Sequence, residues 1–210
     1  MQADCPIAAD LLACWFEDAL HSPAAGERMV QRWFSVNPEF DSLLAARYAD
    51  LPQRVAEGEF DHWRKAAPTA LAALIALDQL PRNLHRGTPR VYAFDSAALA
   101  LAEDAHAAGF HAALHPLAGA FFNLPYEHAE DVALQRRAVA GYRWHAARAA
   151  PGFAELLQRW VAAGEDHLEV IERFGRFPHR NAILERPSTP EELAWMAAGG
   201  KHWGQVPPKS

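Results

Sequence analysis

Cysteine is scarce in this 210-residue chain, which contains only Cys5 and Cys14. Two cysteines without a Cys-x-x-Cys spacing exclude a disulfide framework and a cysteine-rich zinc site. We expect both to be small apolar side chains on the first helix. Such sparse use of cysteine is typical of a reducing compartment, so we expect a cytoplasmic protein.

Long apolar stretches are also missing. The longest one, from Ala66 to Leu77, is interrupted by Pro68 and Thr69 and is too short to span a bilayer. The first apolar run is preceded by Asp4 and by no lysine or arginine, which argues against a secretory signal. We therefore expect no association with a membrane.

Basic charge is in deficit, with 20 basic against 26 acidic side chains and a formal net charge of −6. A general nucleic-acid-binding protein needs a basic surface to displace counterions, so we expect no nucleic-acid partner. Lysine is the rarest of the charged residues, and arginine supplies most of the positive charge. Arginine is the better residue for bidentate contact with a carboxylate or a phosphate, although an alanine-rich composition also favours it.

Several nucleotide, hydrolase and metal motifs are absent from the sequence. It has no Gly-x-x-x-x-Gly-Lys loop and no Gly-x-Ser-x-Gly turn. The chain has 11 histidines, but His106, His111 and His115 do not have the spacing of a His-Glu-x-x-His helix. We therefore predict neither a metal ion nor a cofactor.

What the chain has in abundance is alanine, and β-branched residues are few, which favours helices throughout. We predict one all-α domain over residues 1–198, with eight to nine helices packed as antiparallel neighbours. A loose tail follows over residues 199–210, where two glycines and two prolines break the pattern. The expected helices begin near Ile7, Pro23, Pro38, Pro68, Phe94, Pro116, Glu130, Phe153 and Thr189.

The helix from Pro68 is apolar on all sides between Leu71 and Leu77, which predicts a position at the centre of the bundle. Proline lacks a backbone N–H and disrupts a helix interior. We therefore predict that this helix stops at Leu80 and Pro81.

Three segments combine a proline at a helix end with polar side chains that form several hydrogen bonds. They cover residues 77–88 (LDQLPRNLHRGT), 121–130 (FFNLPYEHAE) and 173–181 (RFGRFPHRN). Polar residues beside proline and aromatic rings are costly to bury unless they bond to one another or to a ligand. The pattern therefore predicts that the three segments form one shared polar pocket.

Arginine outnumbers the carboxylates of these segments, which indicates an anionic ligand that carries a phosphate, carboxylate or sulfate group. Glu127, His128 and His179 are candidates for proton transfer, because imidazole titrates near neutral pH. The candidate ligand-binding residues are Gln79, Arg82, Asn83, Arg86, Arg173, Arg176, Arg180 and Asn181.

The same segments carry a resemblance to the bacterial family named domain of unknown function 924. The resemblance extends from Trp15-Phe16 to residues 189–192 and is strongest in the three polar segments. It implies an all-helical fold related to tetratricopeptide-like superhelices, but it implies no activity. The chain departs from the family pattern at Asn123, where we expect an aromatic residue, and at Ala129, where we expect serine.

A structural interpretation accounts for the same residues without a ligand. Asp78 and Arg82 stand four residues apart and form an ordinary helical ion pair in this interpretation, as do Glu172 and Arg176. The chain is then an interaction module that holds a peptide in an open, tryptophan-lined groove and has no catalytic activity. A ligand pocket requires Arg82 and Arg180 to converge on one buried site, whereas the module requires a separate apolar groove.

Overall fold

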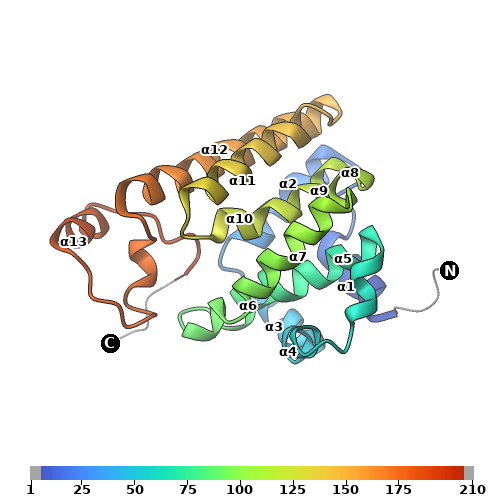
Figure 1. Cartoon of the computed structure of the whole chain (residues 1–210). Helices are drawn as coiled ribbons and strands as arrows, with labels where there is room; N and C mark the ends of the chain where they lie inside the picture. The colour runs from blue at the N-terminus through green and yellow to red at the C-terminus, as the bar shows by residue number, and fades with distance from the viewer. Residues whose placement is uncertain (1–5, 206–210) are drawn as a thin grey trace.

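The computed structural model describes residues 6–205, which form helices and turns but no strand (Figure 1). The all-α class predicted from the sequence is confirmed, and the number of helices is close to the predicted one. The helical segments are α1 (Pro6–Phe16), α2 (Pro23–Phe34), α3 (Pro38–Tyr48), α4 (Leu51–Ala56), η1 (Asp61–Lys65), α5 (Ala67–Leu74), η2 (Ile75–Gln79), α6 (Leu80–Leu84), η3 (Pro89–Tyr92), α7 (Asp95–Ala107), α8 (Phe110–Ala113), α9 (Pro116–Ala120), η4 (Phe121–Asn123), α10 (Leu124–His128), α11 (Val132–Ala146), α12 (Pro151–Phe174), η5 (Pro178–Arg180) and α13 (Pro190–Ala197).

Side-chain caps and prolines define where several of these helices begin. The Asn37 side chain accepts a hydrogen bond from Phe40 N at 3.0 Å, and the Asp131 side chain accepts one from Leu134 N at 2.9 Å. Thr189 and Glu192 form a complete capping box at the start of α13. Such caps satisfy backbone N–H groups that have no partner inside the helix.

Helix α5 lies in the core, as the apolar run from Leu71 to Leu77 predicts. Ala70, Ala72 and Leu74 are completely buried. Aromatic rings fill the neighbouring part of the core, where Trp33 and Phe121 meet edge to face with centroids 5.0 Å apart. Cys14 is buried in α1 as expected, and Cys5 lies outside the described residues.

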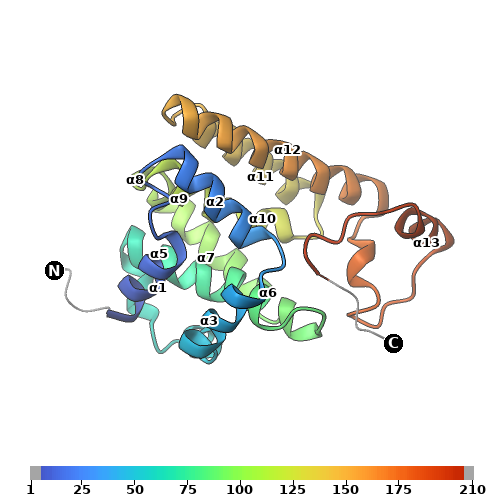
Figure 2. The same ribbon diagram turned by 180° about the vertical axis from the view of Figure 1, so that it is seen from behind.

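Helices α11 and α12 form a long antiparallel pair that lies along one side of the bundle (Figures 1 and 2). Helix α12 has 24 residues, and none of the described helices is long and apolar enough to cross a membrane. The chain turns at the end of α12 through Gly175, whose φ of 69° is in the left-handed region that favours glycine. Helix α13 follows beside this turn, at the edge of the molecule in both views.

The predicted helix end at Leu80 and Pro81 is wrong. Helix α5 continues through the π-helical turn η2 into α6, so residues 67–84 form one helical path. The backbone N–H of Leu80 bonds to the carbonyl of Ile75, five residues earlier. Pro81 then occupies the first turn of α6, where a missing N–H is tolerated.

The predicted loose tail is wrong for residues 199–205. Trp203 stacks on His167 with ring centroids 4.2 Å apart, and Gln205 is buried. Glycines allow this turn, because Gly199 and Gly204 have φ values of 93° and 74°. Residues 206–210 lie outside the described residues.

Candidate ligand-binding site

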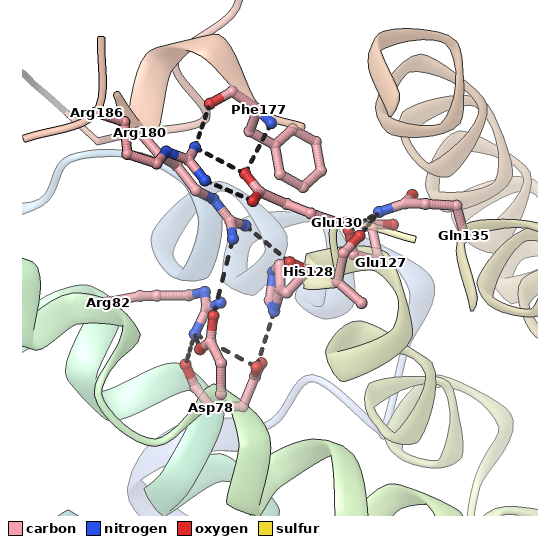
Figure 3. Close-up of polar contacts among 11 residues, drawn as sticks. Asp78, Arg82, Glu127, His128, Glu130, Gln135, Phe177, Arg180 and Arg186 are labelled. Carbon is pink, nitrogen blue, oxygen red and sulfur yellow. Dashed lines mark hydrogen bonds and ion pairs between the residues drawn. The ribbon is translucent and has the colours of Figure 1, made fainter. Parts of the chain in front are cut away.

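The three polar segments meet at one place in the molecule (Figure 3). His128 Nδ1 lies 2.8 Å from Asp78 Oδ1, which joins the second segment to the first. Arg180 Nη2 donates to the His128 carbonyl at 2.9 Å, and Phe177 N donates to Glu130 Oε1 at 2.8 Å. These contacts join the third segment to the second, so helix ends about 50 to 100 residues apart share one hydrogen-bonded network.

A cavity of about 360 Å³ adjoins this network. One part of its wall is apolar and aromatic, formed by Val30, Trp33, Phe34, Leu124, Trp160, Ala163 and Trp203. The residues of its wall that we predicted from the sequence are Gln79, Arg82, Asn83, Arg86, Glu127, His128, His179 and Arg180.

Arg82 lies in the wall of the cavity with one guanidinium nitrogen paired and another unpaired. Its Nη1 atom donates to the Asp78 carbonyl at 2.6 Å and to Asp95 Oδ1 at 2.9 Å. Its Nη2 atom is buried and has no hydrogen-bond partner among the described residues. Burial disfavours the charged form, but Asp78 and Asp95 outweigh burial and hold the pKa of Arg82 above its usual value.

Arg180 approaches the same region from η5 and is held mainly by aromatic rings. Its guanidinium carbon lies 4.6 Å from the ring centre of Tyr92 and 4.4 Å from that of Phe177. Its nearest carboxylate is Asp95, at 3.9 Å, and its Nε atom is buried without a partner. Burial lowers the pKa of Arg180, but a guanidinium keeps its proton in proteins.

Asp78 fixes the orientation of the His128 ring. Burial favours the neutral form of Asp78, but the charge of Arg82 outweighs it and lowers the pKa of this carboxyl to about 2. The ionised Asp78 therefore accepts the Nδ1 proton of His128, which leaves Nε2 as the acceptor nitrogen of the ring. Burial also lowers the pKa of His128, so this imidazole is neutral at pH 7.

Glu127 has the opposite charge state to Asp78. Burial raises the pKa of its carboxyl to about 8, so Glu127 carries a proton at pH 7. Tyr142 lies beside this carboxyl, and His167 Nδ1 lies 3.6 Å from Glu127 Oε1. Two adjacent residues of α10, Glu127 and His128, thus present a neutral acid and a neutral base to one cavity.

His179 also lies in the cavity wall, but its environment differs from that of His128. It packs against Phe177 and Trp203 with centroid distances of 5.6 and 5.1 Å. Burial lowers the pKa of His179 to about 2 and that of His167 to about 3. His179 is therefore a much weaker base at neutral pH than an ordinary histidine.

Asn83 and Arg86 lie in the wall, but their side chains already donate hydrogen bonds to the carboxylate of Asp41 in α3. Arg86 Nε donates to Asp41 Oδ2 at 2.8 Å, and Asn83 Nδ2 donates to Asp41 Oδ1 at 2.8 Å. Gln79 donates to Asp78 Oδ2 at 2.6 Å. These three residues mainly stabilise the wall of the cavity.

Three predicted ligand-binding residues do not line the cavity. Arg173 lies at the exposed end of α12 and pairs with Glu191 at 2.9 Å. Arg176 pairs with Glu192 at 2.6 Å, and Asn181 bonds to Ser188, Arg186 and Glu192. These contacts attach α13 to the turn after α12, so the expectation that Arg173, Arg176 and Asn181 join the pocket is wrong.

The structure adds wall residues that the sequence did not indicate. Tyr92, Tyr142, Trp160 and Trp203 all line the cavity. None of them lies inside a polar motif, and aromatic residues on helices are far more often part of the core. Among the described residues, no group of three or more histidine, cysteine and carboxylate side chains is arranged to hold a metal ion.

Comparison with known proteins agrees with the resemblance seen in the sequence. The model of the family described as "Bacterial protein of unknown function (DUF924)" matches residues 11–200. The fold is similar to the solved structure of a protein of unknown function from Agrobacterium tumefaciens, with 35% identity, a TM-score of 0.74 and coverage of 92% of this chain and 98% of that one. No curated protein matches the chain. The chain therefore belongs to the DUF924 family of bacterial proteins of unknown function.

Proposed function

We propose that the protein binds a small anionic ligand in the cavity and transfers protons to and from it. The single observation that carries this proposal is a set of buried donors without a partner on residues that line the cavity. Arg82 Nη2, Arg180 Nε and the Tyr92 hydroxyl are all buried without a hydrogen-bond partner. A buried donor without a partner costs about 1–3 kcal/mol, and more when it is charged, so oxygen atoms of a bound anion would recover this energy.

The apolar wall defines the other half of the ligand. Trp33, Phe34, Leu124 and Trp160 face the same cavity as the two guanidinium groups. Such a wall favours a ligand that has an apolar body in addition to its charged group.

Glu127 and His128 supply the proposed chemistry. His128 Nε2 is the base, because Asp78 holds the proton of the ring on Nδ1 and stabilises the imidazolium that forms. The protonated carboxyl of Glu127 is the acid. In one turnover His128 accepts a proton from the substrate, Glu127 donates one to it, and exchange with solvent restores both residues.

The alternative is the tetratricopeptide-like interaction module that binds a peptide. It requires an open apolar groove separate from the polar network. In the part of the chain that the structure describes, the exposed large hydrophobic residues are Phe34, Val36, Leu43 and Leu193, and Phe34 already belongs to the cavity wall. No specific observation therefore favours the module over the ligand pocket.

A thermal-shift titration with 4-phenylbutyrate and with phenyl phosphate tests the proposal. A ligand that binds only the folded state stabilises it by about 2.7 kcal/mol at a concentration 100 times its Kd. We expect at least one of these anions to raise the Tm of the wild-type protein, and the Arg180→Gln variant to lose that response. Arg173→Gln is the matched control, because Arg173 is exposed and pairs with Glu191 away from the cavity.

The proposal is contradicted if neither anion raises the Tm of the wild-type protein. It is also contradicted if the Tm of the Arg180→Gln variant rises as much as that of the Arg173→Gln variant. Circular dichroism of both variants establishes that each has folded before the titrations are compared.

A further inference from the structure

The charges around the cavity limit the kind of anion that it accepts. We infer that the ligand is a monocarboxylate with an apolar body and not a phosphorylated compound. This inference rests on the proposed function, because it names the class of ligand for the same cavity.

The two guanidinium groups at the cavity are already partly neutralised. Arg82 lies 3.4 Å from Asp78 Oδ1 and 2.9 Å from Asp95 Oδ1, and Arg180 lies 3.9 Å from Asp95 Oδ2. Two positive and two negative charges thus meet at this end of the cavity. A single additional negative charge bonds to the unpaired guanidinium atoms, whereas a second one meets the field of both aspartates at short range.

No other group in the described wall supplies a free positive charge. Arg86 is held by Asp41, with its Nε atom 2.8 Å from Oδ2 and its Nη2 atom 3.2 Å from Oδ1. Arg159 pairs with Glu27, and no lysine lines the cavity. The three histidines of the wall are neutral at pH 7, because burial lowers the pKa values of His128, His167 and His179.

The number of unpaired donors also fits a carboxylate. Arg82 Nη2 carries two N–H groups, Arg180 Nε carries one, and the Tyr92 hydroxyl carries one O–H, so these atoms offer up to four hydrogen bonds. The four lone-pair positions of a carboxylate accept that number. A phosphate monoester presents three terminal oxygens and about −1.5 to −2 charges at pH 7, so it leaves more charge uncompensated in a buried site.

Glu127 adds a dependence on pH that a carboxylate ligand reveals. Its carboxyl is close to Tyr142 of α11, His167 of α12, and Asp78 and Arg82 at the junction of η2 and α6. Above its pKa of about 8 it ionises and repels an anion in the same cavity. Affinity for a carboxylate therefore falls as the pH rises through 8.

Three probes that share one apolar body test the inference at pH 7. Phenylacetate carries one negative charge, benzyl phosphate carries nearly two, and phenylacetamide carries none. We expect isothermal titration calorimetry to give a Kd for phenylacetate at least tenfold lower than for either of the others. Equal or tighter binding of benzyl phosphate overturns the monocarboxylate but leaves the proposed anion pocket intact. Failure of both anions to bind overturns the proposed function as well.

A second experiment measures the Kd of phenylacetate at pH 7 and pH 9, where the probe itself is fully ionised. With a pKa of about 8, roughly one tenth of Glu127 stays protonated at pH 9, so the apparent Kd rises roughly tenfold. Glu127→Gln removes the titrating group, and we expect its Kd to change less than twofold between the two pH values. A wild-type Kd that is the same at both pH values, or an equal rise in Glu127→Gln, contradicts the role of this carboxyl.

Discussion

Asp78 is the residue that joins the first polar segment to the second. Its Oδ1 atom accepts from His128 at 2.8 Å, and its Oδ2 atom accepts from Gln79 at 2.6 Å. Its carboxylate also compensates the buried charge of Arg82, 3.4 Å away. Because the side chain of Asp78 is completely buried, solvent cannot replace any of these contacts if one partner is lost.

We therefore expect Asp78→Asn to lower the free energy of unfolding by about 3–5 kcal/mol, the usual cost of removing one partner from a buried ion pair. Urea denaturation at pH 7 measures the loss. Asp61→Asn is the control, because Asp61 is exposed and its carboxylate lies 3.7 Å from Arg64. The control is expected to change stability by less than about 0.5 kcal/mol. A similar small effect in Asp78→Asn would contradict the role assigned to this carboxylate.

At the scale of single residues, sequence patterns predicted which residues lie at the cavity better than they predicted the partners of each side chain. Arg82, Arg180 and His128 lie at the cavity as their motifs indicated. Arg173 and Arg176 belong to a similar motif, but they lie on either side of the turn at Gly175 and pair with Glu191 and Glu192 of α13. The direction of a side chain after such a turn depends on tertiary packing, which local spacing does not encode.

At the scale of elements, the π-helical turn η2 could not be predicted from the sequence. The apolar run in α5 correctly indicated a central helix, but Pro81 does not end it. One additional residue in the turn lets the helix continue through the proline. One inserted residue does not visibly change the pattern of apolar and polar residues over so short a stretch. The sequence therefore predicts a helix end where the structure has a widened helical turn. Such π-turns are frequent at functional sites, and this one carries Asp78 and Gln79.

Close contact between α11 and η4 gives a test at the same scale. Gly141 of α11 lies against the side chain of Asn123. The Nδ2 atom of Asn123 donates to the Ala120 carbonyl, and its Oδ1 atom accepts from His106 Nε2 at 3.2 Å. A Cβ atom at position 141 would overlap Asn123. We expect Gly141→Ala to destabilise the protein by about 1–3 kcal/mol, despite the higher helix propensity of alanine.

A double-mutant cycle measured by urea denaturation isolates the cause of this effect. Adding Asn123→Ala to Gly141→Ala removes the overlap, so the pair is expected to be less destabilising than the sum of the two single variants. Strict additivity would show that crowding against Asn123 is not the cause. The family departure noted at position 123 thus coincides with a glycine that accommodates the side chain found there.

At the scale of the whole molecule, the convergence of three distant segments followed from their shared composition. Polar side chains beside prolines and aromatic rings need common partners, and residues 77–88, 121–130 and 173–181 supply them to one another. The contribution of residues 199–205 did not follow, because a segment rich in glycine gives no local sign of packing. Trp203 nevertheless covers His167 and closes one side of the cavity.

The buried titratable groups together predict a stability that falls on both sides of a maximum. Burial lowers the pKa values of His145 and His167 to about 3, below the value of 6.5 in the unfolded chain. As the pH falls below 6.5, these histidines bind protons in the unfolded state but stay neutral in the folded state. The free energy of unfolding therefore decreases down to about pH 3. The contribution of Glu127 to stability changes with pH in the opposite direction, because its folded pKa of about 8 exceeds the unfolded value of 4.5. Its contribution is present below pH 4.5 and is lost as the pH rises to 8.

Urea denaturation between pH 4 and pH 9 separates the two effects with one variant for each. His145 is almost completely buried, and neither of its ring nitrogens has a partner among the described residues, so His145→Leu removes a titrating group without breaking a hydrogen bond. We expect this variant to flatten the loss of stability below pH 6.5 by up to about 1.4 kcal/mol per pH unit, the value for one proton. Glu127→Gln is expected to flatten only the decline between pH 4.5 and 8. An acid decline in His145→Leu as steep as in the wild type would mean that this imidazole takes up its proton in the folded state as readily as in the unfolded chain.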